Sequence, residues 1–349
     1  MKSPRTIMSM VTLAVLVLII FLSRHELVKA WELLGRANMW LLLLLLPLQT
    51  IVYFSGGEMI FSYLRDKKLI KHVSLLEQTR IALELNLVNH IFPSGGVSGI
   101  SYTTWRMHKL GVSSARSTFA QLIRYVMGFV SLMILLILAV AILALDGQVN
   151  RYVVASSFIL VVLVLSLTFA LIFMFSSRRR LHKTSQAVTN FVNNTIRVAT
   201  LGRHKSFLKS EKVDAFFEEM QDDFHDLAAD KKLIIKPLLW GFVFSIFDVA
   251  MFVVAFLSLG VTVNPAMLLV GYGAAGLAGL VAFTPGGTGV YEAIMIIFLT
   301  MAGMSPDVAI AGIILTRAIL LTGTIVFGYI FYQHALIKYG KPDDSKVRR

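Results

Sequence analysis

Long apolar runs separated by short polar segments dominate the chain. Two of them, MWLLLLLLPLQTIVYF (39–54) and FVSLMILLILAVAILAL (129–145), contain no charged residue. A helix of roughly 20 apolar residues crosses the hydrocarbon core of a bilayer. The runs are continuous and do not alternate with polar residues, which favours helices over the strands of a membrane barrel. The pattern predicts an all-α polytopic membrane protein with spans near 7–23, 39–63, 118–145, 152–175, 233–259 and 308–333.

Two further apolar segments are interrupted in the middle. The first, 81–104, has limbs of about 12 residues, or roughly 18 Å of helix, too short to cross a bilayer alone. The second, 266–303, contains FTPGGTGVYEA. Each segment is predicted to be a re-entrant helical hairpin. The interruptions are Pro93, Gly95 and Gly96 in the first segment, and Pro285, Gly286, Gly287 and Gly289 in the second.

The two interrupted segments are similar. GVSSARSTFAQLIR (111–124) follows the first and GMSPDVAIAGIILTR (303–317) follows the second, so each is followed by a Gly-x-Ser turn and a span that carries an arginine. Paired broken segments in opposite orientation are typical of transporters built from inverted repeats. We therefore predict one transmembrane domain, 1–349, with repeat 1 at about 39–145 and repeat 2 at about 233–335.

Charge sets the predicted orientation. The chain has a net charge of +13, and basic residues gather at both termini and in the segments 65–80, 106–116 and 178–212. The positive-inside rule places all of these, and both termini, in the cytoplasm. The first hairpin then enters from the cytoplasmic side and the second from the opposite side. A signal peptide at 7–22 is disfavoured because SRHELVKAWE, which follows, lacks a cleavage site.

The longest polar stretch, 177–232, is predicted to be a cytoplasmic connecting region. Within it VDAFFEEMQDDFHDLA (213–228) has apolar residues at helical spacing on one face and acids on the other. We expect an amphipathic helix packed against the membrane face of the protein, with binding of a partner as the alternative.

The broken helices indicate a polar site inside the membrane. Proline ends a helix and glycine allows the chain to reverse, which leaves unpaired amides at the start of the next half-helix. Such an end attracts anions. Arg124 and Arg317 are candidates to bind the substrate, or they form structural ion pairs. Glu292 either pairs with one of these arginines or carries a coupling proton, and Asp248 has the same two interpretations.

In the first hairpin, Asn89 and His90 share a helical face with Asn86. Asn89 and His90 are further candidates for substrate binding, although His90 could equally be an ordinary hydrogen-bonded helix residue.

Composition and motifs exclude several classes. The chain has no cysteine, and it lacks the nucleotide-binding and hydrolase motifs, so we expect no metal, no cofactor, no catalysis and no ATP-driven pumping by this chain alone. Aromatic residues that could stack on bases do not accompany the basic clusters, which disfavours nucleic acid as a partner. Anionic lipid headgroups explain the positive charge more simply.

PSGGVSG with Arg124, and TPGGTGVYEA with the following GMSPDVAIAGIILTR, resemble the membrane region of the lysylphosphatidylglycerol synthase and flippase family. The similarity covers roughly 10–335. It implies a multi-pass protein of the bacterial inner membrane, in a family of which some members move lysylated phospholipid or other modified lipids and many have no assigned substrate. It also places Glu292 and Arg317 on the second signature of the family, with Pro285, Gly286, Gly287 and Gly289.

Two departures from the family are visible. Tyr291 stands where the family often has arginine, which bears on the headgroup bound. The soluble aminoacyl-transferase domain is expected to be absent, so transfer of lysine is not expected.

These observations lead to the hypothesis of a lipid translocase that moves an anionic or modified headgroup through a midplane polar site. Its partner would be a membrane phospholipid or a lipid-linked substrate. One alternative is an accessory subunit that positions a lipid-modifying enzyme, and another is a proton-coupled transporter of small solutes using Glu292 and Asp248. The sequence is compatible with a homo-oligomer.

Overall fold

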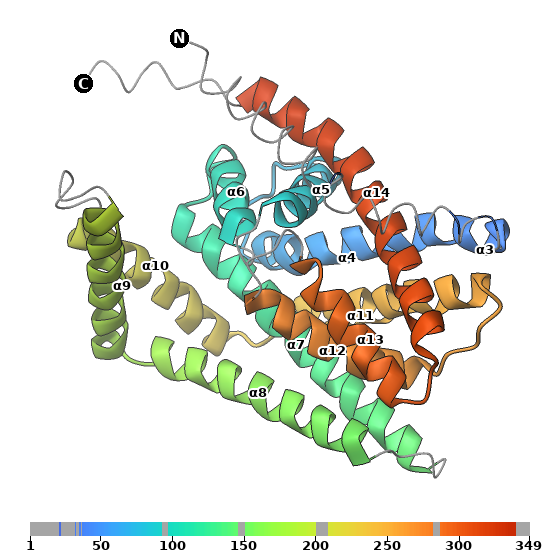
Figure 1. Ribbon diagram of the computed structural model, residues 1–349. Helices are drawn as coiled ribbons and strands as arrows, with labels where there is room; N and C mark the ends of the chain where they lie inside the picture. The colour runs from blue at the N-terminus through green and yellow to red at the C-terminus, as the bar shows by residue number, and fades with distance from the viewer. Residues whose placement is uncertain are drawn as a thin grey trace.

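The computed structural model describes residues 37–92, 97–145, 151–199, 209–281 and 287–339, with the single residues 21, 32 and 35. Every regular element in these ranges is a helix, which confirms the all-α prediction (Figure 1). The predicted helix near 7–23, apart from residue 21, and the residues Pro93, Gly95, Gly96, Pro285 and Gly286 lie outside the described part of the chain. The helices are α3 (Met39–Leu43), α4 (Leu45–Asp66), α5 (Leu75–Ile91), α6 (Val97–His108), α7 (Ser114–Leu145), α8 (Arg151–Phe175), α9 (Arg178–Ala199), α10 (Ser210–Ala229), α11 (Lys232–Ser258), α12 (Pro265–Val281), α13 (Val290–Met301) and α14 (Pro306–Tyr339).

Five helical segments are long and apolar enough to cross a membrane, counted over the described residues. They confirm a multi-pass membrane protein. The predicted span at 39–63 consists of two helices in the structure, because the chain departs from regular helix at Leu44, whose amide bonds to the carbonyl of Leu41. The five segments are Met39–Asp66, Ser114–Ile142, Val154–Phe175, Lys232–Ser258 and Pro306–Tyr339.

Basic residues from several described segments meet near α10, and we call this end of the molecule the basic end. Lys236 on α11 pairs with Asp66 at the end of α4, with 2.6 Å between Nζ and Oδ1. Lys67 pairs with Asp223 of α10 at 3.0 Å. These contacts bring residues 65–72 and 231–236 together under α10.

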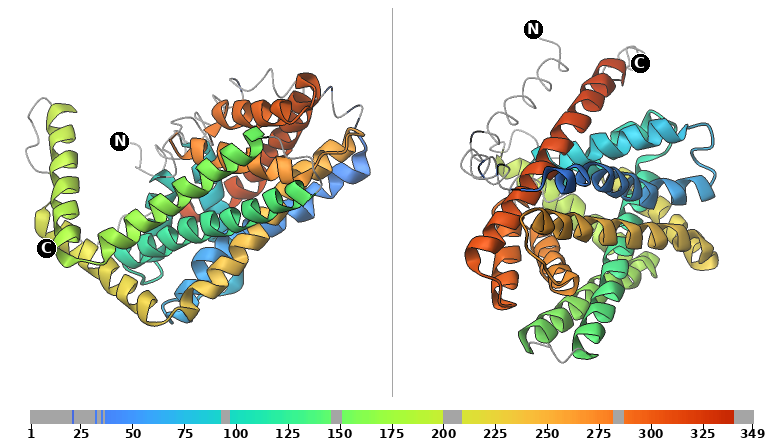
Figure 2. Two further views of the ribbon diagram at one scale, coloured as in Figure 1. Left: turned by 90° about the horizontal axis from the view of Figure 1, so that it is seen from below. Right: turned by 90° about the vertical axis from the view of Figure 1, so that its right-hand side faces the viewer.

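Helices α8, α9 and α10 form an arm beside the main bundle, and α9 projects from it in the left view of Figure 2. The apolar face of α10 turns inward: Met220 is buried, and Phe216, Phe217, Phe224 and Leu227 pack around the same cluster. The cluster also contains Phe119 of α7 and Phe175 of α8. Helix α10 therefore covers the ends of the long helices at the basic end.

Two pairs of shorter helices have the same lengths. Helices α5 and α6 contain 17 and 12 residues, and α12 and α13 also contain 17 and 12. Helix α5 begins at Leu75, earlier than the predicted 81, because the Ser74 hydroxyl caps it by accepting from the amide of Glu77. The pair α5–α6 packs next to α4 and α7, and the pair α12–α13 packs next to α11 and α14.

A tight turn with a left-handed glycine connects each pair to the long helix that follows. Gly111 has φ +84° before α7, and Gly303 has φ +96° before α14. Ser113 then accepts a hydrogen bond from the amide of Arg116 at 3.3 Å, which caps α7. These turns fix the start of the two helices that carry Arg124 and Arg317.

Candidate functional site

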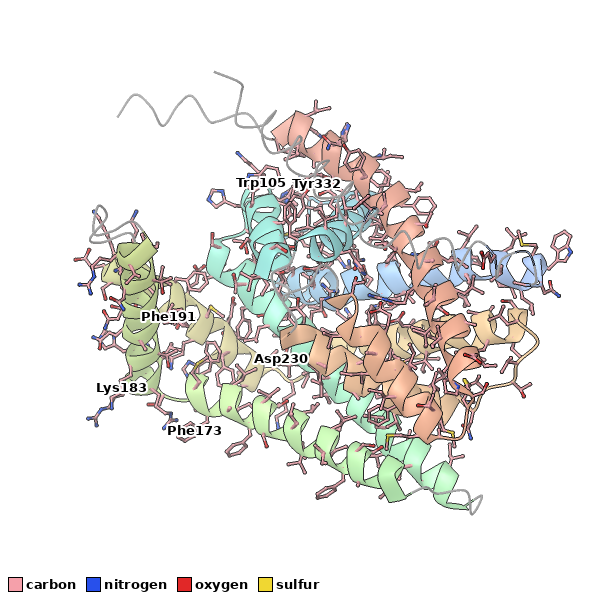
Figure 3. The ribbon with its side chains drawn as sticks, in the orientation of Figure 1. Trp105, Phe173, Lys183, Phe191, Asp230 and Tyr332 are labelled. Carbon is pink, nitrogen blue, oxygen red and sulfur yellow. The ribbon has the colours of Figure 1, made fainter. Side chains whose placement is uncertain are left out.

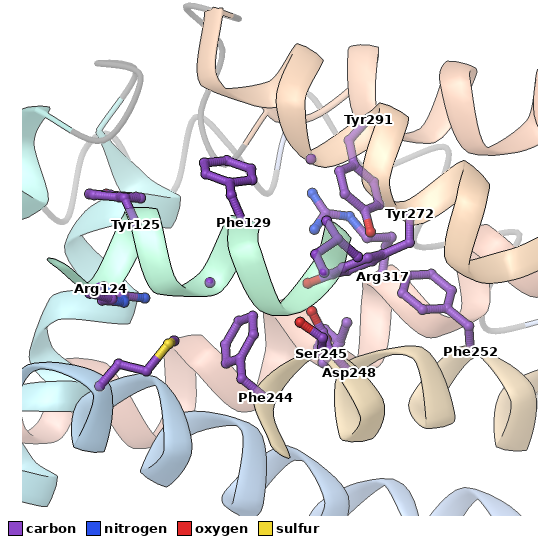
Figure 4. A pocket seen from close by; sticks show the side chains of 15 residues that line it. Arg124, Tyr125, Phe129, Phe244, Ser245, Asp248, Phe252, Tyr272, Tyr291 and Arg317 are labelled. Atoms are coloured by element: carbon purple, nitrogen blue, oxygen red, sulfur yellow. The ribbon is translucent and has the colours of Figure 1, made fainter. Parts of the chain in front are cut away.

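A polar cavity of about 230 Å³ lies among α4, α7, α11, α12, α13 and α14 (Figure 4). Its lining comes from helices that the sequence predicts to be within the membrane, so its polar side chains stand out against an apolar surrounding. The polar residues that line it are Arg124, Tyr125, Ser245, Asp248, Tyr272, Tyr291 and Arg317.

Arg317 on α14 is held by the helix that follows the second interruption. Its Nε donates to Oε1 of Glu292 at 2.6 Å. The other oxygen of this carboxylate accepts from the amide of Gly289 at 2.6 Å, so Glu292 also caps α13. The guanidinium lies 4.7 Å from the centre of the Tyr291 ring. The Glu292 carboxylate thus balances both Arg317 and the positive end of the α13 dipole.

The backbone before α13 depends on glycine. Gly287 and Gly289 have φ +70° and +88°, a region that residues with a side chain rarely adopt. A Cβ on Gly287 would also lie 3.4 Å from the Cα of Gly279. These two glycines therefore let the chain turn close to α12 and bring Glu292 into line with Arg317.

Arg124 on α7 is different. Among the residues that the structure describes, it forms no ion pair, and its guanidinium lies 5.7 Å from the centre of the Tyr125 ring. Gly56 of α4 lies beside it: a Cβ there would be 3.7 Å from Nη2, an ordinary contact distance, and 3.3 Å from the Phe244 ring. Arg124 therefore brings a positive charge to the cavity wall that no neighbouring carboxylate in the described chain neutralises.

Asp248 on α11 faces the cavity from the side opposite to α13. Its carboxylate interacts with the hydroxyl group of Tyr272, and it lies within electrostatic range of Arg317 (Figure 4). Tyr272 in turn packs edge to face on Tyr291, with 6.5 Å between the ring centres. A carboxylate, three phenols and two guanidinium groups thus line one small space.

The first hairpin contributes to the surroundings of this cavity. His90 lies within electrostatic range of Arg317 and Glu292, while its Nδ1 is 2.8 Å from the carbonyl oxygen of Asn86. Asn89 packs on Gly99, where a Cβ would lie 2.0 Å from Oδ1. Asn89 and His90 are not among the residues that line the polar cavity. Their positions place the end of α5 close to the start of α13.

A second buried cluster joins α5, α6 and α14 at the basic end. Arg106 is 1% exposed, and it pairs with Glu84 at 2.8 Å and Glu77 at 2.7 Å. The Tyr102 hydroxyl donates to Glu84 at 2.9 Å. Breaking a buried pair of this kind is costly, so the cluster fixes the first hairpin against the bundle. Trp105 and Tyr332, labelled in Figure 3, lie where α6 meets α14.

The sequence analysis named Arg124, Arg317 and Asp248, which line the cavity, and Glu292, which pairs with Arg317. It did not name Tyr125, Ser245 or Tyr272, and it named Tyr291 only as a departure from the family. These four residues come from four different helices, and no spacing along the chain connects them. Over the described residues, no group of three or more metal-ligating side chains forms.

The fold and the cavity define a polytopic helical membrane protein with a polar site between its spans. Residues 7–328 match the family described as the lysylphosphatidylglycerol synthase TM region. The chain belongs to this family. A UPF0104 membrane protein of Methanothermobacter thermautotrophicus is 22% identical over 236 residues, which cover 66% of this chain and 67% of the relative. No solved structure matches the chain.

Proposed function

We propose that this protein is a lipid translocase whose polar cavity carries an anionic or modified headgroup while the acyl tails stay in the bilayer. One observation carries the proposal: Arg124 lines a cavity between membrane helices and has no carboxylate partner in the described chain. A guanidinium in such surroundings is costly, and it is normally retained for a partner or a pathway. Phosphate fits this group well, because its oxygens accept two parallel hydrogen bonds.

The size of the cavity agrees with a headgroup rather than a whole lipid. Sites for drug-sized ligands occupy roughly 300–1,000 Å³, whereas this cavity has about 230 Å³. A phosphate with a small substituent can enter such a space. The negative charge of Asp248 on the far wall lowers the affinity of the cavity for an anion. Transport needs an affinity low enough for the headgroup to be released.

The proposed architecture is a pair of inverted repeats. The equal lengths of α5–α6 and α12–α13, and the left-handed glycines at Gly111 and Gly303, support it. The two hairpins would be re-entrant from opposite faces and meet near Glu292. With the basic end in the cytoplasm of a bacterial inner membrane, the positive-inside rule is satisfied and the chain termini are cytoplasmic.

The test is lipid flipping in proteoliposomes, with headgroup-labelled phosphatidylglycerol and phosphatidylcholine and a quencher that cannot cross the membrane. Wild-type protein is compared with the double variant Arg124→Gln and Arg317→Gln. We expect protein-dependent flipping of the anionic probe that the double variant loses. Folded wild-type protein that flips no probe would contradict the proposal.

A second candidate is a membrane accessory subunit that positions a lipid-modifying enzyme. The exposed side of α9 favours it, because Phe191 is 74% and Val198 67% exposed on a helix without acidic residues. Replacing residues 211–230 of the adjoining α10 would abolish a docking function, whereas the arginine double variant would leave it intact. If the protein is a translocase, the arginine double variant should lose more flipping activity than the variant with residues 211–230 replaced.

Proton coupling is a third candidate and rests on Asp248, whose carboxylate meets Tyr272 inside the cavity. Transport of a small solute by this route would respond to pH, and Asp248→Asn would abolish that response. Flipping that keeps the same pH profile in Asp248→Asn would exclude the aspartate as the coupling residue.

A further inference from the structure

A second cavity of about 340 Å³ lies between α7, α8, α10 and α11, and its lining is apolar except for two residues. One wall of the cavity comes from α7, with Ile123 and Met127, and another from α8, with Ile172 and Phe175. Helix α10 contributes Leu227. The two polar residues are Thr168 and Lys231. The cavity is more than twice the size of the roughly 150 Å³ apolar void that binds benzene in an engineered protein.

Helix α7 separates this apolar cavity from the polar one. Ile123, Val126 and Met127 face the apolar cavity, whereas Arg124, Tyr125 and Gly128 face the polar cavity. The two spaces therefore lie back to back on the same stretch of helix. An occupant of the apolar cavity does not need to touch either cavity arginine.

One end of the apolar cavity carries a positive charge. Lys231 joins α10 to α11 at the basic end, is exposed, and forms no ion pair in the described chain. Asp230, labelled in Figure 3, precedes it, but its carboxylate is used to accept from the amide of Lys232 at 3.0 Å. Ile172, which is 48% exposed, marks the side where the cavity reaches the outer surface of α8.

We propose that this cavity binds one acyl chain of an anionic phospholipid whose phosphate lies at Lys231. A long apolar space with a single cation at its membrane-surface end matches a chain with an anionic head, and each lysine near such a surface favours anionic lipid. Apolar surface left unfilled at this size loses contacts that an acyl chain supplies. The site does not depend on translocation, so a lipid bound there also stabilises the contact between the arm and the bundle.

The experiment is native mass spectrometry of the full chain, released from nanodiscs that contain equal amounts of phosphatidylglycerol and phosphatidylcholine. Lys231→Gln removes the charge, and Lys232→Gln is the matched control because Lys232 is exposed and does not line the cavity. Ala228→Trp fills the cavity from α10, and Ala229→Trp, at the exposed neighbouring position, is its control.

We expect Lys231→Gln to lower the ratio of retained phosphatidylglycerol to phosphatidylcholine by roughly fivefold, with the ratio unchanged in Lys232→Gln. Ala228→Trp should lose both lipids relative to Ala229→Trp. Equal retention in the two tryptophan variants, or equal ratios in the two glutamine variants, would overturn the proposal.

A phospholipid with a diazirine in its acyl chain gives a second readout that works even if a variant folds poorly. In wild-type protein the crosslinks should map to residues of the apolar cavity, namely Leu122, Ile123, Val126 and Met127 on α7 and the segment 168–175 on α8. Crosslinks confined to other helices would contradict the site. Because binding is measured without transport, failure of this proposal and failure of the translocase proposal are distinguishable.

Discussion

The surroundings of Arg124 and Arg317 differ although the two helices begin in the same way. Each arginine lies in a long helix that follows a turn with a left-handed glycine, and both line the polar cavity. Arg317 is tied to Glu292 at 2.6 Å, while Arg124 forms no ion pair in the described chain. One position explains the contrast, because the first hairpin has Ile100 where the second has Glu292.

The carbonyl oxygen of Ile100 accepts from the side chain of Gln121, 3.3 Å away on α7. The first hairpin thus contacts the arginine-bearing helix through its backbone, and the second does so through a charge. Two long helices that begin in the same way thus carry one arginine held by an ion pair and one arginine that forms no ion pair in the described chain. A headgroup meeting this cavity would therefore be attracted mainly by Arg124.

The largest expected effect comes from removing the carboxylate that pairs with Arg317. Glu292→Ala removes the carboxylate that bonds both to the Arg317 guanidinium and to the Gly289 amide in a largely buried site. Removal of one member of a buried pair costs about 3–5 kcal/mol. We expect a large fall in the thermal midpoint of the purified protein, followed by intrinsic fluorescence. Asp307→Asn, in the exposed first turn of α14, is the control: it loses only a surface interaction with the helix dipole of about 0.3–1 kcal/mol, so it should lower the midpoint far less. A stable Glu292→Ala protein would show that the ion pair does not hold α13.

The next largest effect is expected at Arg124, which forms no ion pair in the described chain. Arg124→Gln should reduce flipping of anionic lipid roughly tenfold, as expected when a charge-assisted hydrogen bond is lost. The thermal midpoint should change little, since no ion pair is broken. Arg124→Lys retains the charge but not the two parallel donors, so we expect intermediate flipping.

The single variant Arg317→Gln is the comparison for Arg124→Gln. It should lower the thermal midpoint, because Glu292 then loses its partner. If Arg124→Gln destabilises the protein as much as Arg317→Gln does, the two arginines have the same structural role and the contrast between them is wrong.

The sequence was enough to predict the helical class, the family and the residues with unusual charge in apolar surroundings. Arg124, Arg317, Glu292 and Asp248 stand out because ionisable side chains are rare in membrane helices. Tyr272 does not stand out, and Tyr291 does so only through the resemblance to the family, because the approach of these two residues to Asp248 depends on how α11, α12 and α13 pack. The Arg106 cluster was missed for the same reason: its partners Glu77 and Glu84 lie on another helix.

The smallest effect tests whether the two turns before α7 and α14 are equivalent. Gly111→Ala and Gly303→Ala each force a side chain into a left-handed conformation, at a cost of roughly 1–2 kcal/mol. A Cβ at either position meets no atom within 4 Å, so crowding adds nothing and the two costs should be equal. Gly279→Ala is the control, because Gly279 is helical, also has open space, and alanine is the better helix former. Thermal midpoints that fall equally for Gly111→Ala and Gly303→Ala, and not for Gly279→Ala, would show that the helices bearing the two arginines start from matched turns. Unequal shifts of the thermal midpoint would show that the two turns already differ, so that the difference between the two halves of the chain does not begin at the arginines.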